Sequence, residues 1–140
     1  MTRAVPRAAL APLAIVALML GACRATEPGS VRLVGDWGGE HAGLIASADS
    51  GVLEYDCAAG RITEPLITRA DGTIDWRGTH TPGHGGPARI DEALPRRPAR
   101  YTGMLAGARL SLTVVMTDSN VTVGTFTLVR GASPHVFKCL

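Results

Sequence analysis

Apolar and polar residues alternate along much of this chain. Residues 53–57 read Leu-Glu-Tyr-Asp-Cys, so that every second side chain is apolar or a cysteine. The same period of two recurs over residues 73–77 and, with one exception at Val115, over residues 110–116. Successive side chains of a β-strand point to opposite faces of its sheet, so this pattern predicts strands with one buried face.

Eight strands are expected, because clusters of Gly, Asp, Asn, Ser and Ala separate the apolar runs at regular intervals. Outside the first 22 residues, no stretch shows a helical period of sufficient length. The fold class predicted is therefore all-β. The expected strands are residues 39–47, 51–57, 61–68, 72–80, 99–106, 109–117, 121–130 and 134–139.

The connections between these strands are mostly of hairpin length. A sheet with one apolar face must close or fold over itself to bury that face. Short connections favour a single small antiparallel meander barrel, and a two-sheet sandwich remains the alternative.

The first 22 residues have the composition of an export signal. Arg3 and Arg7 precede the uncharged stretch of residues 10–20, and small residues follow it. A charged region, an apolar core and a small-residue cleavage site, in this order, indicate a signal peptide. A transmembrane helix is less well supported, because Pro6 and Pro12 interrupt a stretch shorter than the roughly 20 residues that a span needs.

The signal ends in "LGAC", residues 20–23. This ending resembles the lipobox of bacterial lipoproteins, which implies that the sulfur of Cys23 is lipidated and that the new N-terminus carries an acyl chain such as palmitate. Several acyl chains give a stable membrane anchor. The expected organisation is a signal peptide over residues 1–22, a flexible tether over 23–34 and a β-barrel domain over 35–140. Arg24, at the position where the inner-membrane retention signal is usually Asp, implies the periplasmic side of the outer membrane in an organism with two membranes.

Processing changes both the charge and the cysteine count. The chain has 14 Lys and Arg against 12 Asp and Glu, and removal of Arg3 and Arg7 leaves 12 against 12. A neutral domain has no general field that attracts nucleic acid, so that class of partner is excluded. Cys57 and Cys139 remain as an even pair in an exported protein and are expected to form one disulfide, with a catalytic thiol as the alternative.

Gly35-Asp36-Trp37 precedes the first expected strand. It resembles the Gly-x-Trp signature of lipocalins, which implies a lipocalin-like or calycin-like barrel whose bottom is closed by Trp37. The alternative for Trp37 is an ordinary core residue. The stretches "WGGEH", "YDCAAG", "GGP", "ARYTG" and "GTFTL" are similar to those of small secreted bacterial proteins without assigned activity.

The longest expected connection is residues 81–98. Long loops without secondary structure are often functional. Five residues in or next to it are candidates for binding an anionic or protein partner, and the alternative is a solvated loop whose arginines pair with Asp91 and Glu92. These candidates are His80, His84, Arg96, Arg97 and Arg100.

No metal, cofactor or catalysis is expected. His80 and His84 lie four apart, but the prolines and glycines around them exclude the helix that would align them, and a loop would have to bring them to His41 or Glu40. The chain contains neither a zinc-binding motif nor a Gly-x-Ser-x-Gly elbow nor a phosphate-binding loop.

These features favour a lipid-anchored envelope module that binds a small apolar ligand or an envelope protein, attached to the membrane through its lipid. Two alternatives stay open. Tyr55-Asp56-Cys57 with Gly60, and Ala99-Arg100-Tyr101, resemble the membrane-bound inhibitors of c-type lysozyme, which implies a protein inhibitor. A structural envelope lipoprotein without a ligand is the other.

Overall fold

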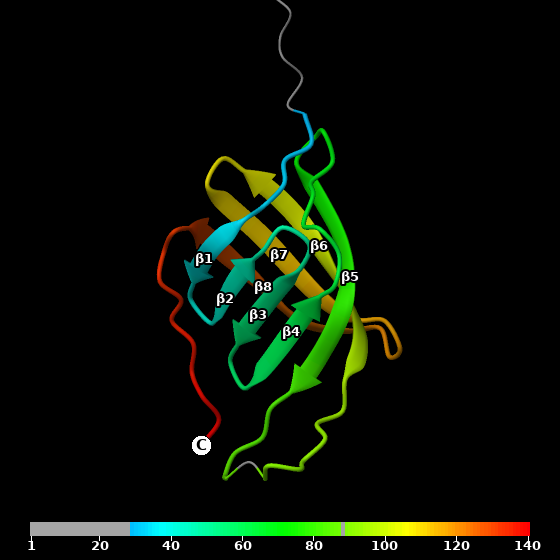
Figure 1. Ribbon diagram of the computed structural model, residues 1–140, viewed down its shortest axis with the longest axis vertical. Coiled ribbons are helices and arrows are strands. Elements are labelled where there is room, and N and C mark those ends of the chain that lie inside the picture. The colour runs from blue at the N-terminus through cyan, green and yellow to red at the C-terminus, as the bar shows by residue number, and fades with distance from the viewer. Residues whose placement is uncertain (1–28, 88) are drawn as a thin grey trace, which may run out of the picture.

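The computed structural model describes residues 29–87 and 89–140. The signal peptide and the first half of the expected tether, including Cys23 and Arg24, lie outside these residues. Eight strands form one closed antiparallel barrel (Figure 1). The strands are β1 (Gly35–Gly39), β2 (Ala42–Ala46), β3 (Gly51–Tyr55), β4 (Ala58–Ile62), β5 (Thr73–Pro82), β6 (Arg97–Ala106), β7 (Arg109–Met116) and β8 (Val121–Arg130).

The barrel is a simple meander. Each strand pairs antiparallel with the next one in the chain, and β8 returns to β1 through two residue pairs, Trp37 with Arg130 and Gly38 with Val129. The prediction of an eight-stranded meander barrel is therefore confirmed, and the sandwich is excluded. Within the described residues, no helix is long and apolar enough to cross a membrane.

The expected strand 39–47 is wrong at its start. In its place the structure has a hairpin of β1 and β2 that turns at Glu40 and His41, where His41 takes a φ of 68°. The β3–β4 turn is also displaced, from Ala58-Ala59-Gly60 to Asp56-Cys57, with a φ of 55° at Cys57. Both turns contain a non-glycine residue in the left-handed region, which sequence patterns rarely reveal.

Two further expected strands are wrong. After Ile62 the chain leaves the sheet, because Pro65 lacks the N–H that a ladder requires, and Leu66 folds inward to become fully buried. Residues 134–139 form no strand. A single parallel bridge between Glu40 and His135 is the only ladder contact described for this segment.

The barrel interior is filled with side chains. Alternate residues of every strand point inward and form one cluster, as the period of two predicts. The cluster consists of Leu33, Trp37, Ala42, Leu44, Ala46, Leu53, Tyr55, Ile62, Leu66, Ile74, Trp76, Ala99, Tyr101, Leu110, Leu112, Val114 and Leu128.

The chain before β1 packs on one end of this core. Leu33 is fully buried, and its backbone N–H donates to the carbonyl oxygen of Leu66. Thr68 joins the same contact, because its backbone N–H donates to Val31 and its hydroxyl accepts the N–H of Val31. The last residues of the expected tether are thus part of the folded domain.

Residues 131–140, here called the C-terminal strap, run back along the outside of β1 and β2 (Figure 1). A Cβ atom at Gly38 would collide with the strap backbone, and one at Gly43 would collide with the ring of Pro134. The strap is fixed at its end by the Cys57–Cys139 disulfide, which confirms the predicted pairing. Glycine at these two positions therefore serves the strap rather than a turn.

Candidate functional site

The residues expected to form one binding loop lie in separate elements of the structure. His80 belongs to β5 and points into the barrel, with an exposed fraction of 6%. Its Nδ1 atom lies 2.8 Å from the hydroxyl of Tyr55. His80 is therefore not available at the surface of the loop, and its role as a candidate for partner binding is corrected here.

The three arginines do not form one free cluster. Arg97 makes a bidentate pair with Asp118, with both distances at 2.9 Å. Arg100 makes another with Asp75, at 2.6 and 2.7 Å. The partners are Asp75 on β5 and Asp118 in the β7–β8 turn, so the alternative in which Arg97 and Arg100 pair with Asp91 and Glu92 is also wrong.

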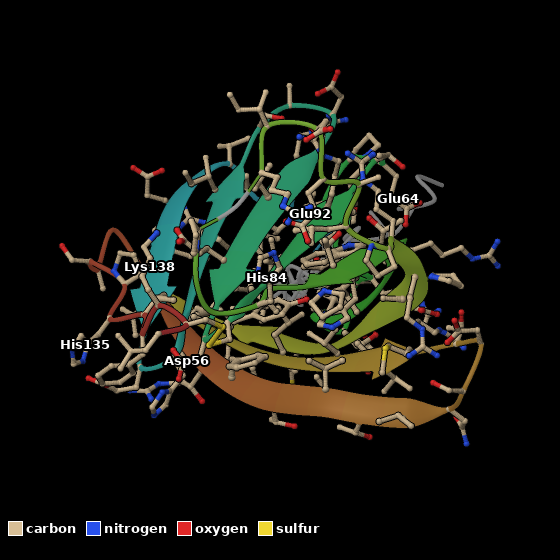
Figure 2. All side chains as sticks on the ribbon, turned by 90° about the horizontal axis from the view of Figure 1, so that it is seen from below. Asp56, Glu64, His84, Glu92, His135 and Lys138 are labelled. Carbon is tan, nitrogen blue, oxygen red and sulfur yellow. A yellow bond between two sulfur atoms is a disulfide. The ribbon has the colours of Figure 1, made fainter. Side chains whose placement is uncertain are left out.

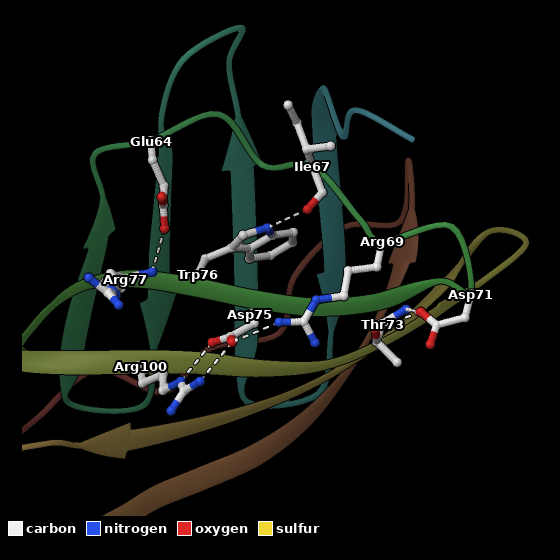
Figure 3. Close-up of polar contacts among 9 residues, drawn as sticks. All are labelled: Glu64, Ile67, Arg69, Asp71, Thr73, Asp75, Trp76, Arg77 and Arg100. Carbon is white, nitrogen blue, oxygen red and sulfur yellow. Dashed lines mark hydrogen bonds and ion pairs between the residues drawn. The ribbon is translucent and has the colours of Figure 1, made fainter. Parts of the chain in front are cut away.

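The Arg100–Asp75 pair, on the outer side of β5 and β6, is part of a small network of hydrogen bonds. Figure 3 shows Asp75 between the guanidinium groups of Arg69 and Arg100. The hydrogen bonds from Arg100 hold the pKa of Asp75 below its ordinary value. In the same way, Arg97 lowers the pKa of Asp118. These charges are neutralised within the barrel wall, which leaves Arg96 as the member of the expected cluster that lines a surface hollow.

His84 remains in the loop between β5 and β6. Its Nε2 atom lies 3.0 Å from a carboxylate oxygen of Glu92. The pKa of His84 is raised by its hydrogen bond with the carbonyl oxygen of Gly85 and by the charge of Glu92. The loop histidine is thus engaged with its own loop, and the described residues contain no group of three or more potential metal ligands.

The lower part of the barrel interior contains an aromatic stack. The ring of Tyr55 lies between His80, at 5.7 Å, and Phe126, at 5.4 Å, with small interplanar angles. The hydroxyl of Tyr101 donates to the carbonyl oxygen of Thr79 at 2.7 Å. Burial raises the pKa of Tyr55, raises that of Tyr101 to about 12, and lowers that of His80. These groups stay uncharged near neutral pH and act as core.

Four residues of the lysozyme-inhibitor resemblance have structural roles in the barrel. Tyr55 and Tyr101 are buried, Cys57 is in the disulfide, and Arg100 is bound to Asp75. Trp37 is also buried, with the guanidinium of Arg130 4.8 Å from its ring centre. It occupies the seam where β1 meets β8.

An apolar pair lies on the outside of the barrel. Ile45 on β2 and Val52 on β3 are directly opposite each other in the ladder, and their exposed fractions are 64% and 42%. Val52 forms a wall of two adjoining hollows: one of about 360 Å³ bounded by the strap, and one of about 510 Å³ bounded by Leu94 and Arg96. We call Ile45, Val52 and Leu94 the outer patch.

The sequence contains a signal for this patch in two outward apolar positions. An apolar Val52 stands at a position of β3 where alternation with Leu53 requires an outward residue. Ile45 likewise stands at an outward position of β2, next to the inward Leu44. Outward apolar residues that face each other across two strands make this surface a candidate for contact with another molecule.

Comparison of the chain with protein-family models, with curated proteins and with solved structures finds no match.

Proposed function

We propose that this chain is a lipid-anchored envelope module that binds a protein partner through the outer patch. The carrying observation is the contrast between a barrel interior filled with side chains and an exposed Ile45–Val52 pair flanked by hollows. An interior cavity for a small apolar ligand is the less favourable version, because the inward positions are occupied by large residues such as Trp37, Tyr101 and Trp76.

The surroundings of the patch suit a protein interface. Its centre is apolar, and its rim carries Glu54 paired with Lys138, together with Arg61 and Arg96. An apolar centre with a charged and hydrated rim is the usual arrangement of such interfaces. No catalytic step is proposed.

The proposal of an anchor rests on the sequence "LGAC" and on the disulfide. A disulfide between cysteines 82 positions apart is typical of a protein that folds in an oxidising compartment. The proposed location is a membrane of the cell envelope. In an organism with two membranes it is the outer membrane.

Mass spectrometry of the native protein tests the anchor. We expect a mature chain that begins at Cys23 with its sulfur and amino group acylated, and Cys23→Ala should abolish the modification and release the protein from membranes. An intact leader, or an unmodified N-terminus at another residue, would refute the anchor without touching the proposal for the outer patch.

Photo-crosslinking in intact cells tests the patch. Ile45→p-benzoylphenylalanine is expected to give one discrete protein adduct that is lost when Val52→Glu is added. Met104, exposed to 48% on β6, is the matched control position and should give no such adduct. Equal adducts at both positions would contradict the proposal. An adduct with lysozyme, followed by reduced lysis in an activity assay, would replace it with the inhibitor alternative.

A further inference from the structure

A second site arises where the barrel closes. β8 has ten residues, but β1 pairs only with Val129 and Arg130 near its end. Among the described strand pairings, residues 121–127 are bonded to β7 alone. The lower half of β8 is therefore a sheet edge, although the barrel as a whole is closed.

The backbone groups of this edge can be assigned by alternation. The N–H of Arg130 donates toward β7, to the carbonyl oxygen of Ala108, whereas the N–H of Gly131 donates to Asp36 beside β1. Successive residues of a strand direct their N–H and C=O groups to opposite sides. Thr125 and Thr127 therefore direct theirs away from β7, and the carbonyl oxygen of Thr127 indeed lies against Gly39.

A slot of about 540 Å³ lies beside this edge. One wall is formed by residues 123–127 of β8, and the other by His41, Tyr55 and Asp56 from the β1–β2 and β3–β4 turns. Figure 2, seen from below, shows Asp56 and His135 next to the end of the barrel where this slot opens. The ring of Phe126, stacked on Tyr55, provides an apolar inner surface. We call this space the β8 slot.

The edge lacks the side chains that commonly block pairing with another chain, although a β-bulge between Thr122 and Gly124 interrupts its ladder with β7. Natural edges are blocked by lysines, prolines or inward charges. Residues 121–127 read Val-Thr-Val-Gly-Thr-Phe-Thr, which includes no charge and no proline. Its side chains are mainly β-branched or aromatic, which favour an extended partner.

We propose that the β8 slot binds one extended polypeptide segment by strand addition to Thr125 and to the N–H of Thr127, with apolar side chains of the segment facing inward and basic ones outward. The carbonyl oxygen of Thr127 lies against Gly39 and takes no part. Backbone hydrogen bonds supply the affinity in this mode of recognition, and alternate side chains supply the specificity.

The preference for basic residues follows from the charges of the slot. Glu40 and Asp56 line it, and no Lys or Arg does. The imidazole of His41 is hydrogen-bonded to Asp56, and that of His135 to Glu40. The backbone N–H of Phe137 holds the pKa of Asp56 below its ordinary value, so this carboxylate stays ionised.

A second copy of this chain fits less well than a single segment. The β8 strand of a second copy is already flanked by its own β7. Entry of that two-stranded edge would place β7 of the second copy against the turns that hold His41 and Asp56. A single extended segment has no such neighbour.

The test uses the full chain in detergent micelles and a capped eight-residue peptide of alternating valine and lysine. Two further peptides carry N-methyl groups on all valines or on all lysines. In an extended chain, one of these two sets points its N–H groups toward β8 and the other points away. We expect the parent peptide to shift the amide resonances of Thr125 and Thr127 and to slow their hydrogen exchange at least tenfold. One methylated peptide should lose binding and the other should keep it.

Three outcomes would overturn the proposal. These are absence of binding at millimolar peptide, equal effects of the two methylated sets, and resonance shifts confined to the outer patch. Shifts of Thr125 and Thr127 that depend on protein concentration without peptide would assign the edge to a second copy instead. Glu40→Gln should weaken the lysine peptide about threefold, whereas Glu64→Gln, a carboxylate outside the slot, should leave its affinity unchanged.

Discussion

The two halves of the barrel are built differently. β1 to β4 have five residues each, whereas β5 to β8 have eight to ten. The long strands are connected by extended ladders, such as the eight residue pairs between β6 and β7. The short strands contain glycines at positions 38, 39 and 43 and are covered from outside by the C-terminal strap. The long half is held by its own ladders, and the short half depends on a segment from the other end of the chain.

Loss of the disulfide is the strongest way to break this contrast. In the double variant Cys57→Ser, Cys139→Ser the unfolded chain gains the freedom of an 82-residue separation, for which the chain-entropy account gives about 4.5 kcal/mol. We expect the free energy of unfolding in urea to fall by about 3–4.5 kcal/mol. Amide exchange should accelerate first in β1 to β4. A loss below about 1 kcal/mol, or uniform acceleration across all eight strands, would show that the strap does not support the short half.

A collision under the strap is expected to have the next largest effect. Gly43→Leu places a side chain where the ring of Pro134 lies, and overpacking of this kind typically costs about 1–3 kcal/mol. In a Pro134→Gly background the cost should shrink. Gly29→Leu is the control, because nothing lies near its side-chain position. Equal costs in both backgrounds, measured by urea denaturation, would contradict the contact.

The buried His80 connects the halves, because it lies on β5 and bonds to Tyr55 on β3. Burial lowers its pKa when the chain folds, so the unfolded state binds a proton that the folded state resists. Stability is therefore highest above the unfolded pKa of about 6.5 and falls as the pH decreases below it, by at most about 1.4 kcal/mol per pH unit.

His80→Asn should be less stable at pH 7 but should lose this pH dependence between pH 6.5 and 5. The exposed His84 has a raised pKa and acts in the opposite direction, so both proteins should be measured in a His84→Gln background. An unchanged slope in His80→Asn would assign the dependence to another group.

The smallest effect is expected within the long half. Arg100→Ala removes the exposed guanidinium that binds Asp75 across β5 and β6, and exposed pairs contribute little to stability. We expect a change in the unfolding midpoint smaller than in any variant above, and a rise in the pKa of Asp75 by NMR titration. A large destabilisation would show that the long ladders also need support from side chains.

The contrast between the short and the long strands also explains which parts of the fold could be predicted from the sequence. The expected strands 72–80, 109–117 and 121–130 lie close to three of the long strands, and the alternation over residues 73–77 and 110–116 reflects the buried faces of β5 and β7. Counting cysteines predicted the disulfide. The β1–β2 hairpin was missed because glycines at 38, 39 and 43 remove the alternation. Gly38 and Gly43 make room for a strap about 95 residues away, and Gly39 makes room for the backbone of β8.

Residues 134–139 of the strap were expected to form a strand because they follow the turn residues Gly131, Ala132 and Ser133. Its contacts are instead irregular: the N–H of Phe137 donates to the carboxylate of Asp56 rather than to a ladder partner. The candidate sites were harder to find. The burial of His80 and the pairing of Arg97 and Arg100 depend on strand register, and the β8 slot exists only because β1 stops short.

The two ends of the barrel have a consequence for orientation. Residues 31–34 lie at one end, whereas the loop between β5 and β6 and the end of the chain lie at the other (Figure 1). With the anchor proposed at Cys23, eight peptide steps lead to Val31, a reach of at most about 29 Å. The barrel would then stand with its Leu33 end toward the lipid. The end of the barrel beside Asp56 would face away from the bilayer, toward soluble and wall-bound polymers.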